Sequence, residues 1–360
     1  MPGEMQLVAF VAAALAIALL VSFLMTPLVK TFAHKVGAVD VPKDDRRMHD
    51  HPIPRMGGLA IFLGFLFSTL IFVELTGAVK GMLLGAVIIV VLGVFDDIYA
   101  LRAMPKFLVQ IVAALVAVFS GNRIEVISNP NIFSSNPWWE LGILAVPVTV
   151  IWIVAVTNSV NLIDGLDGLA CGVSTISSMT MLVIAMAVSD GEVAMLMAAL
   201  AGACIGFIPY NLNPAKIFMG DTGSTFLGYI LAVVSIQGLF KFYTIISFVV
   251  PFLMLGLPIF DTCFAFVRRI AHGQSPMHAD RSHVHHRLID MGLSQKQAVA
   301  VLYVISAILG LSAVVLTTST PIKAMLLLFA LCAAGAVAMR IFIGGGEKRR
   351  HRDKEGKKDE

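Results

Sequence analysis

The sequence is poor in charged residues, which make up 14 % of its 360 positions, while hydrophobic residues make up 58 %. The mean hydropathy is +0.87. This balance excludes an ordinary soluble domain. The net charge of +3 is small, and no basic stripe runs along the chain, so nothing predicts a nucleic-acid partner. We therefore expect a protein that lies in lipid.

Cysteine is scarce and dispersed. Cys171, Cys204, Cys263 and Cys332 lie singly in apolar segments and form no CxxC pair. This spacing excludes a disulfide framework and indicates small hydrophobic residues. An internal repeat is also absent, which disfavours transporters built from duplicated halves. The first apolar run lacks a basic flank before it, so we do not expect it to be a cleavable signal peptide.

Long, continuously apolar runs dominate the rest of the chain. Only helices or closed barrels satisfy backbone polar groups in lipid, and runs without alternation favour helices of about 20 residues. The sequence therefore predicts an all-α polytopic membrane protein with about eleven transmembrane helices. The predicted spans are 5–29, 56–77, 79–95, 104–120, 140–157, 168–189, 191–208, 225–240, 242–265, 296–317 and 320–343.

The basic residues fall mostly on one side of this predicted membrane. With the N-terminus outside, all 26 lysines and arginines except Lys80, Arg123, Lys241 and Lys323 share the opposite side. The positive-inside rule makes that side, and with it the C-terminus, cytoplasmic. We expect one integral-membrane catalytic domain at 1–343, with its active site formed by cytoplasmic loops, and a disordered charged tail at 344–360.

The first cytoplasmic connection, 30–55, is long and basic and leads into Gly57 and Gly58. Its cations could contact phosphates or anchor the chain at the membrane surface, and the sequence leaves both open. Two glycines at a helix start permit a close approach of backbones.

Two adjacent carboxylates, Asp96 and Asp97, end the third apolar run, where the helix dipole disfavours negative charge. Acids at a membrane boundary are a functional hypothesis by default. Mg²⁺ typically takes one or two carboxylates and completes its shell with water and substrate phosphates. The pair therefore predicts Mg²⁺, or a phosphate held through it.

The third connection places Asn158, Asn161, Asp164 and Asp167 three residues apart, so that a helix would put them on one face. Amides and carboxylates suit a base edge, a ribose or sugar hydroxyls. A calcium-binding loop is excluded by the spacing and by the missing terminal glutamate.

In the fourth connection, Asp221 lies between two glycines and precedes an apolar helix. It could cap that helix, although capping alone would not need a glycine on both sides. Phe218, in the same connection, could be a core residue or a platform on which a nucleobase stacks.

The fifth connection carries Arg281, His283, His285 and His286. A zinc site is disfavoured because no cysteine or acid pattern completes it and the arginines would repel a cation. We interpret the cluster as a lid facing a polyphosphate. Asp261, inside the preceding helix, is either catalytic or paired with a nearby cation.

Assembled in order, the strings PRMGG, FDD, NSVNLIDGLDGLA, NLNPAKIFMGDTGS and HADRSHVHHRL resemble the polyprenyl-phosphate N-acetylhexosamine-1-phosphate transferase superfamily, a glycosyltransferase family 4 type, along nearly the whole chain. The resemblance implies transfer of a sugar 1-phosphate from a UDP-sugar to a polyprenyl phosphate, releasing UMP. It also implies Mg²⁺, for which Mn²⁺ could substitute, and a multi-pass location in the bacterial cytoplasmic membrane with the site on the cytoplasmic face.

Two branches of that superfamily differ at these motifs. Phospho-MurNAc-pentapeptide translocases typically carry three consecutive histidines, a threonine-rich string before MGG and ten spans. This chain has HVHH, HPIPRMGG and eleven predicted spans. It is more similar to the WecA/TagO-like GlcNAc-1-phosphate transferases that start O-antigen, common-antigen or teichoic-acid-linkage synthesis.

The resemblance also suggests roles for the site residues. Asp221 matches the family's FMGD aspartate and would be the first Mg²⁺ ligand, with Asp97 as a second metal residue. Asp96 and Asp97 would complete the metal environment or orient the lipid phosphate. Asp96, Asp97, Asp221 and His283 would form the catalytic group. Phosphate charge would be balanced by Lys106, Arg281, His283, His285 and His286. The uridine and the sugar would be held by Asn158, Asn161, Asp164, Asp167, Asn211 and Phe218.

Two further readings stay open at this point. A secondary transporter would also combine many helices with intramembrane acids, although its site would lie near the bilayer midplane. A homodimer paired through apolar helix faces is compatible with the sequence.

Overall fold

The computed structural model describes residues 2–41, 52–128, 136, 138–188, 190–238, 245–271 and 283–319, and three isolated positions, 323, 327 and 330. Arg281 and the predicted tail at 344–360 lie outside these residues. The chain divides into two units, Met1–Val314 and Val315–Glu360. The architecture described below is that of the first unit.

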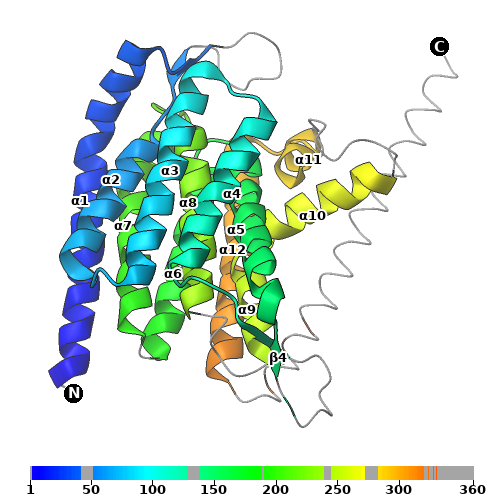
Figure 1. Ribbon diagram of the computed structural model, residues 1–360. Helices are drawn as coiled ribbons and strands as arrows, with labels where there is room; N and C mark the ends of the chain where they lie inside the picture. The colour runs from blue at the N-terminus through cyan, green and yellow to red at the C-terminus, as the bar shows by residue number, and fades with distance from the viewer. Residues whose placement is uncertain are drawn as a thin grey trace, which may run out of the picture. The chain divides into compact units, whose positions relative to one another are not determined.

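Helices make up most of the described chain (Figure 1). The helices are α1 (Pro2–Val36), α2 (Gly58–Phe72), α3 (Gly77–Tyr99), α4 (Ala103–Phe119), α5 (Ala145–Leu162), α6 (Leu169–Ala187), α7 (Gly191–Asn211), α8 (Gly220–Gly238), α9 (Ile245–Met254), α10 (Gly256–Ala271), α11 (Val284–Asp290) and α12 (Gln295–Thr318), with a 3₁₀ turn, η1, at Gly142–Leu144.

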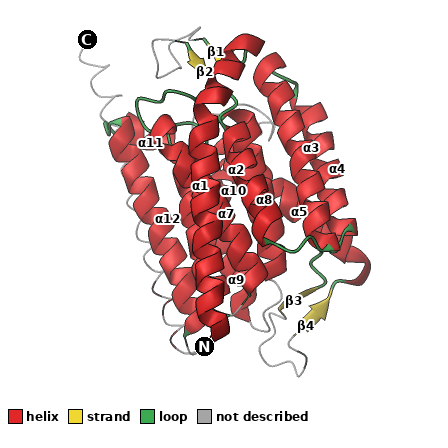
Figure 2. Cartoon of the chain, turned by 90° about the vertical axis from the view of Figure 1, so that its left-hand side faces the viewer, coloured by secondary structure: helices red, strands yellow, loops and turns green. Residues whose placement is uncertain are grey.

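Two short antiparallel strand pairs lie at opposite ends of the helices (Figure 2). β1 (Val39–Asp40) pairs with β2 (Ile53–Pro54), with Asp40 opposite Ile53. β3 (Val126–Ser128) pairs with β4 (Trp138–Glu140), with Ile127 opposite Trp139. The β1–β2 pair and α11 mark the same end of the molecule.

Six described helices are long and apolar enough to cross a membrane, and two more, α2 and α4, are shorter apolar helices. The six segments are Met5–Val36, Gly77–Tyr99, Gly142–Leu162, Leu169–Ala187, Gly191–Asn211 and Gln295–Thr318. The chain is thus an all-α, multi-pass membrane protein, as the sequence predicts.

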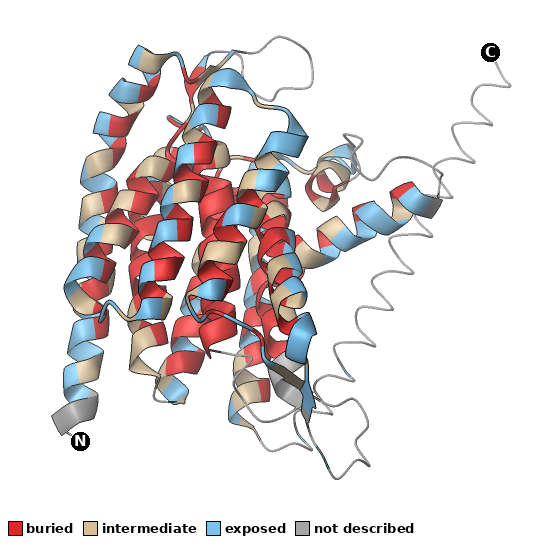
Figure 3. Cartoon of the chain, in the orientation of Figure 1, coloured by how far each residue is buried: buried red, intermediate tan, exposed pale blue. Residues whose placement is uncertain are grey.

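The centre of the bundle is α8, which is buried at every position from Thr222 to Gly238 (Figure 3). It packs against α3 and α5, with further contacts to α2, α6 and α7. Small residues allow this close packing. A Cβ at Gly228 would lie 2.7 Å from the Thr157 Cα, and Gly85 of α3 faces the hydroxyl of the buried Tyr229. Close backbone approach at small residues is the usual way helices associate in lipid.

The long helix α1 packs on α7 through a second glycine pair. Gly202 and Gly206 lie one turn apart on α7, and a Cβ at either would run into the carbonyl oxygen of Leu15 or Leu19. The remaining surface of α1 is largely exposed (Figure 3), as expected of a helix that faces lipid.

One predicted span, 242–265, is wrong as a single helix. α9 ends at Met254, Leu255 lies in a turn, and α10 begins at Gly256 and leaves the direction of α9 (Figure 1). The physical reason is the sequence Gly256-Leu-Pro258. Proline lacks an N–H and fits the first turn of a new helix, whereas glycine weakens the continuation of the old one.

Candidate active site

The carboxylate of Asp97, near the end of α3, caps the start of α8. Its Oδ1 accepts a hydrogen bond from the Asp221 N–H at 2.9 Å. Its Oδ2 accepts from the Thr222 N–H at 3.1 Å and from the Thr222 hydroxyl at 2.6 Å. Asp97 is buried, and the positive end of the α8 dipole favours its negative charge. The capping role that the sequence offered to Asp221 thus belongs to Asp97 on another helix.

Glycines allow these segments to meet. Gly220 starts α8 with a φ of +71°, and a Cβ there would overlap the Asp97 carboxylate. A Cβ at Gly58 would overlap the backbone of Gly223, so the predicted close approach at the start of α2 is confirmed. Gly58 N–H also donates to the Met219 carbonyl at 2.9 Å.

With its backbone held in this way, Asp221 directs its side chain toward α4. The Lys106 Nζ lies 2.6 Å from Asp221 Oδ2 and 2.7 Å from Asp96 Oδ2. Asp96 is buried and also accepts from the Leu101 N–H at 2.7 Å. One ammonium group therefore bridges two carboxylates that come from α3 and α8.

A polar cavity of about 280 Å³ opens beside Asp221. Seven residues that the sequence predicts for the site line it: Asn161, Asp164, Asp167, Asn211, Phe218, Asp221 and His286. Asp96, Asp97 and Lys106 adjoin this group through Asp221 but are not among the lining residues. The cavity lies just below the usual size range of small-molecule sites, and its lining is more polar than is usual for them.

The predicted common face of four polar residues is only partly formed. α5 ends at Leu162, so Asn158 and Asn161 are helical while Asp164 and Asp167 lie in the turns that lead into α6. Gly168, with a φ of +78°, begins the new helix direction. The turn nevertheless brings Asn161, Asp164 and Asp167 to one cavity, where a continuous helix was expected to do so.

Asn158 has its polar atoms occupied elsewhere. Its Nδ2 donates to Gln110 Oε1 at 2.6 Å and to the Val154 carbonyl at 2.8 Å, and its Oδ1 accepts from Gln110 Nε2 at 3.5 Å. It joins α5 to α4 and does not line the cavity. Its geometry is that of a residue that positions the helix carrying Asn161.

Asp167 organises the loop between α7 and α8. Its Oδ2 accepts from Asn213 Nδ2 and from the Ala215 N–H, both at 3.0 Å. Asn213 Nδ2 also donates to Gln295 Oε1 at 2.7 Å. Asn211 turns its Nδ2 to the Ile217 carbonyl at 3.0 Å, and its Oδ1 is buried without a hydrogen bond. These contacts hold the loop that presents Phe218.

The histidines of the fifth connection are not equivalent. His286 lines the cavity, His285 packs against Gly165, and the buried His283 lies against Asp261. The imidazoles of His285 and His286 have their centroids 4.3 Å apart. Only one of the three predicted histidines is therefore in position to meet a molecule in the cavity.

The surroundings shift the pKa values of Asp164 and His285. Burial raises the pKa of Asp164 to about 8, and the charges of Asp221 and Asp97 act in the same direction. Burial lowers the pKa of His285 to about 4, assisted by His286. Near neutral pH these shifts favour the protonated form of Asp164 and the neutral form of His285.

A family model described as glycosyl transferase family 4 matches residues 79–239, the segment that holds most of these groups. A probable undecaprenyl-phosphate N-acetylglucosaminyl 1-phosphate transferase of Bacillus subtilis is 46 % identical over 320 residues, which are 88 % of this chain and 87 % of that protein.

The chain belongs to glycosyl transferase family 4. A decaprenyl-phosphate N-acetylglucosaminephosphotransferase of Mycolicibacterium smegmatis is 32 % identical over 82 % of the chain and 79 % of that protein. A phospho-N-acetylmuramoyl-pentapeptide-transferase of Heliobacterium modesticaldum is 35 % identical, but over 51 % of the chain. Both the predicted superfamily and the predicted GlcNAc-1-phosphate transferase branch are confirmed.

The structure also brings residues to this family 4 site that the sequence analysis did not select. Asp40 lines the cavity with Arg55, whose Nη2 lies 4.0 Å from Asp40 Oδ1. Gln295, the first residue of α12, lines it as well. Arg55 was among the cations considered for phosphate contact. Asp40 and Gln295 were missed because each lies outside the five matching strings.

The donor set is suited to Mg²⁺. Among the described residues, no three His, Cys, Asp or Glu side chains form a ready metal-binding group. Mg²⁺ does not require one, because it typically binds through one or two carboxylates together with waters and phosphates. Asp221 lines the cavity and already has a cationic ammonium 2.6 Å from its Oδ2, so the position favours positive charge.

Proposed function

We propose that this protein transfers GlcNAc 1-phosphate from UDP-GlcNAc to undecaprenyl phosphate, giving undecaprenyl-diphospho-GlcNAc and UMP. The observation that carries the proposal is the polar cavity beside Asp221, formed by the family's own motifs in a chain 46 % identical to a protein named for this transfer. We place the reaction on the cytoplasmic face of the bacterial cytoplasmic membrane, because the loops that form the cavity belong to the predicted basic side.

The chemistry is a displacement at phosphorus. An oxygen of the lipid phosphate forms a bond to the β-phosphorus of UDP-GlcNAc, and the bond from that phosphorus to the bridging oxygen breaks. UMP leaves with the bridging oxygen. A phosphate monoester has a second pKa of about 6, so the lipid phosphate is mostly a dianion at neutral pH. The dianion can attack directly, and no covalent enzyme intermediate is needed. Catalysis then depends on positioning and on charge stabilisation.

In this proposal Asp221 is the first ligand of Mg²⁺, and Asp97 supports it by fixing its backbone and by its negative charge. Bound Mg²⁺ would supply a Lewis acid that neutralises the diphosphate of the donor. Lys106, freed from one of its two carboxylates, would lie close enough to Asp221 to contribute positive charge to the phosphates. Asp96 would keep Lys106 in place.

The remaining lining residues fit the uridine and the sugar. Asn161, Asp167 and Asn211 offer amides and a carboxylate to hydroxyl groups and a base edge. Phe218 offers a ring face on which the uracil could stack. A protonated Asp164 could donate a hydrogen bond to the donor without repelling its phosphates. His286 would approach the phosphates from α11.

The test is UMP release by the purified protein with Mg²⁺ and undecaprenyl phosphate, comparing UDP-GlcNAc with UDP-MurNAc-pentapeptide. We expect release with UDP-GlcNAc alone. Release only with the pentapeptide donor would retain the mechanism and contradict the branch. Release with neither, from protein shown to be folded, would contradict the transferase proposal. Uptake into proteoliposomes would then test the transporter alternative.

A further inference from the structure

A buried aspartate outside the cavity holds the short helix that carries the histidines. Asp261 lies on α10 and is 4 % exposed. Its Oδ2 is 2.9 Å from Nδ1 of His283, and its Oδ1 accepts the N–H of Val284 at 2.9 Å. One carboxylate therefore binds both the imidazole at the N-cap of α11 and the first backbone N–H of that helix.

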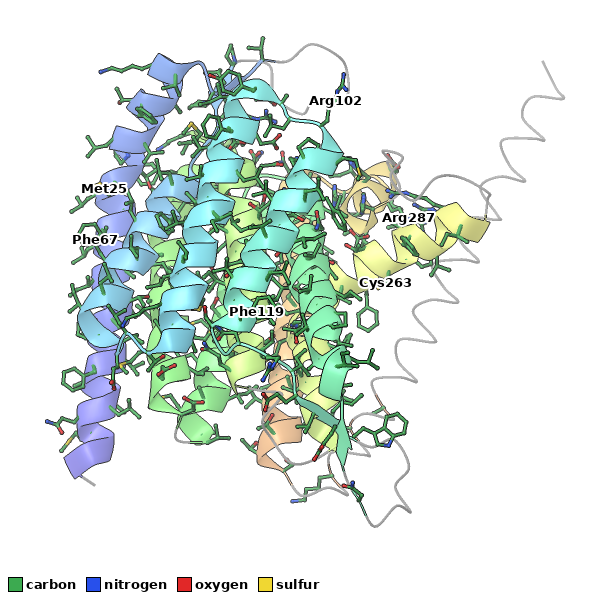
Figure 4. All side chains as sticks on the ribbon, viewed as in Figure 1. Met25, Phe67, Arg102, Phe119, Cys263 and Arg287 are labelled. Atoms are coloured by element: carbon green, nitrogen blue, oxygen red, sulfur yellow. The ribbon has the colours of Figure 1, made fainter. Side chains whose placement is uncertain are left out.

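This contact replaces the usual cap of α11. The side chain of His283 makes no capping hydrogen bond. The unpaired N–H groups of a first helical turn need an acceptor, and α10 supplies one through Asp261. A second contact joins the same helices, because the guanidinium of Arg287 lies 5.1 Å from the ring centroid of Phe264 on α10. Figure 4 labels Arg287 and, on α10, Cys263. α10 is otherwise notable for its exposed apolar face (Figure 3).

The pairing also fixes the chemical form of His283. An ionised carboxylate only accepts hydrogen bonds, so this contact requires a proton on Nδ1 of His283. From this ring the contacts continue toward the cavity. The ring centroids of His283 and His285 are 5.8 Å apart and nearly parallel, and those of His285 and His286 are 4.3 Å apart. His286 lines the cavity.

We propose that Asp261 is a positioning residue of the transfer reaction. It holds His283 in the Nδ1–H tautomer and docks α11 on α10, so that His286 stands at the cavity wall. This inference rests on the proposed function, since it assigns Asp261 to the same site. It also gives a role to Asp261, a buried acid whose hydrogen bonds go to His283 and Val284 and not to the residues around Asp221.

The test is a set of variants: Asp261→Asn, His283→Asn and the double variant. Asparagine can still accept from the Val284 N–H, but it presents an N–H to the imidazole, so His283 should shift to the Nε2–H tautomer. We expect kcat for UMP release to fall about 10- to 100-fold, the usual effect of losing a hydrogen-bond partner that orients a histidine, with KM for UDP-GlcNAc little changed. The loss is expected because the place of His286 at the cavity wall depends on this contact. In the His283→Asn background, Asp261→Asn should cost no further activity.

A matched control is Thr262→Val, one residue along α10. The Thr262 hydroxyl is buried and has no hydrogen-bond partner among the described residues, so its loss should leave kcat unchanged. Additive losses in the double variant, or a kcat of Asp261→Asn equal to the parent value, would overturn the proposal.

¹⁵N NMR of histidine-labelled protein separates this inference from the transferase proposal. The His283 signal, identified by its loss in His283→Asn, should report Nδ1–H in the parent and Nε2–H in Asp261→Asn, whatever substrate the protein uses. A parent without UMP release but with this tautomer change would reject the proposed function and retain the Asp261–His283 pair. An unchanged tautomer would reject the pair.

Discussion

At the scale of single residues, the site is defined by the ion pairs and hydrogen bonds of three aspartates. Lys106 lies between Asp96 and Asp221, and Asp97 gives both of its oxygens to the start of α8. Of the three carboxylates, Asp221 alone lines the cavity. Asp221 is therefore the carboxylate that a molecule in the cavity can reach, while Asp96 is held by Lys106 and Asp97 by the start of α8.

The first prediction concerns Asp221. Asp221→Asn keeps the size of the side chain but removes the charge expected to bind Mg²⁺. We expect UMP release to fall by at least about 10²–10³-fold, the usual cost of removing one preorganised electrostatic group. Asp190→Asn serves as control, because Asp190 caps α7 through the Val193 N–H and asparagine caps equally well. A near-normal rate for Asp221→Asn with Mg²⁺ would refute the metal assignment.

The second prediction concerns the pH dependence of stability. The pKa of Asp164 is about 8 in the folded protein and about 3.9 for an unfolded chain. The folded state therefore binds the proton more tightly, and the stability this gives is complete below pH 4 and is lost as the pH rises through 8. Asp164→Asn should not lose it.

We therefore expect Asp164→Asn to melt at a higher temperature than the parent at pH 8 without Mg²⁺, and at the same temperature at pH 4. Thermal unfolding in detergent measures both. Glu125→Gln, which removes an exposed carboxylate paired with Arg123, should show no such pH-dependent gain. A gain for Asp164→Asn that is equal at both pH values would disprove the assigned cause.

At the scale of elements, the site depends on helix ends that meet at glycine. The sequence marked Gly57, Gly58 and the glycines around Asp221 as unusual. The close contact of Gly58 with Gly223, and of Gly220 with the Asp97 carboxylate, leaves no room for a side chain at these positions. It could not indicate that Asp97 caps α8, because that depends on α3 and α8 packing side by side. The continuous face expected from Asn158 to Asp167 failed for a local reason: α5 ends at Leu162.

The third prediction tests the junction of α2 and α8. In Gly58→Ala the new methyl group would overlap the backbone of Gly223, which cannot rotate away as a side chain can. Overpacking of this kind costs typically about 1–3 kcal/mol. We expect a lower melting temperature and a strong loss of UMP release, because the start of α8 carries Asp221.

Gly77→Ala is the matched control, since the nearest atom to a Cβ there is the Ser120 carbonyl oxygen at 3.9 Å. Alanine is the better helix former by up to about 1 kcal/mol, so this variant should be unchanged or slightly stabilised. Equal melting temperatures for the two alanine variants would contradict the tight junction.

At the scale of the whole molecule, hydropathy predicted the class, an all-α protein of the membrane. The motif strings predicted which connections gather, because seven of the predicted site residues, from the third, fourth and fifth connections, line one cavity. The division of 242–265 into α9 and α10 was not foreseen, since periodicity does not show where an apolar run changes direction. Asp40 and Gln295 likewise reach the cavity only through the fold.

The fourth prediction tests the orientation of the chain in the membrane. Lys216 and Arg123 are both exposed and lie in connections predicted for opposite sides. In a background whose native cysteines are replaced by alanine, a membrane-impermeant maleimide added to intact cells should label Arg123→Cys and spare Lys216→Cys. Permeabilised cells should label both. The reverse result in intact cells would invert the topology.

The tight glycine contacts at the start of α8 limit which substitutions could make the protein resistant to an inhibitor. Resistance to a compound that fills the cavity requires a substitution that weakens its binding and leaves the protein working. Around the start of α8 few such substitutions exist, because a side chain at Gly58, Gly93 or Gly220 would strike backbone or the Asp97 carboxylate. Resistant strains should instead change residues such as Gln295, where the cavity wall comes from the surface of a separate helix. Compounds that press against Gly220, the one of these three glycines that lines the cavity, should therefore keep their potency longest.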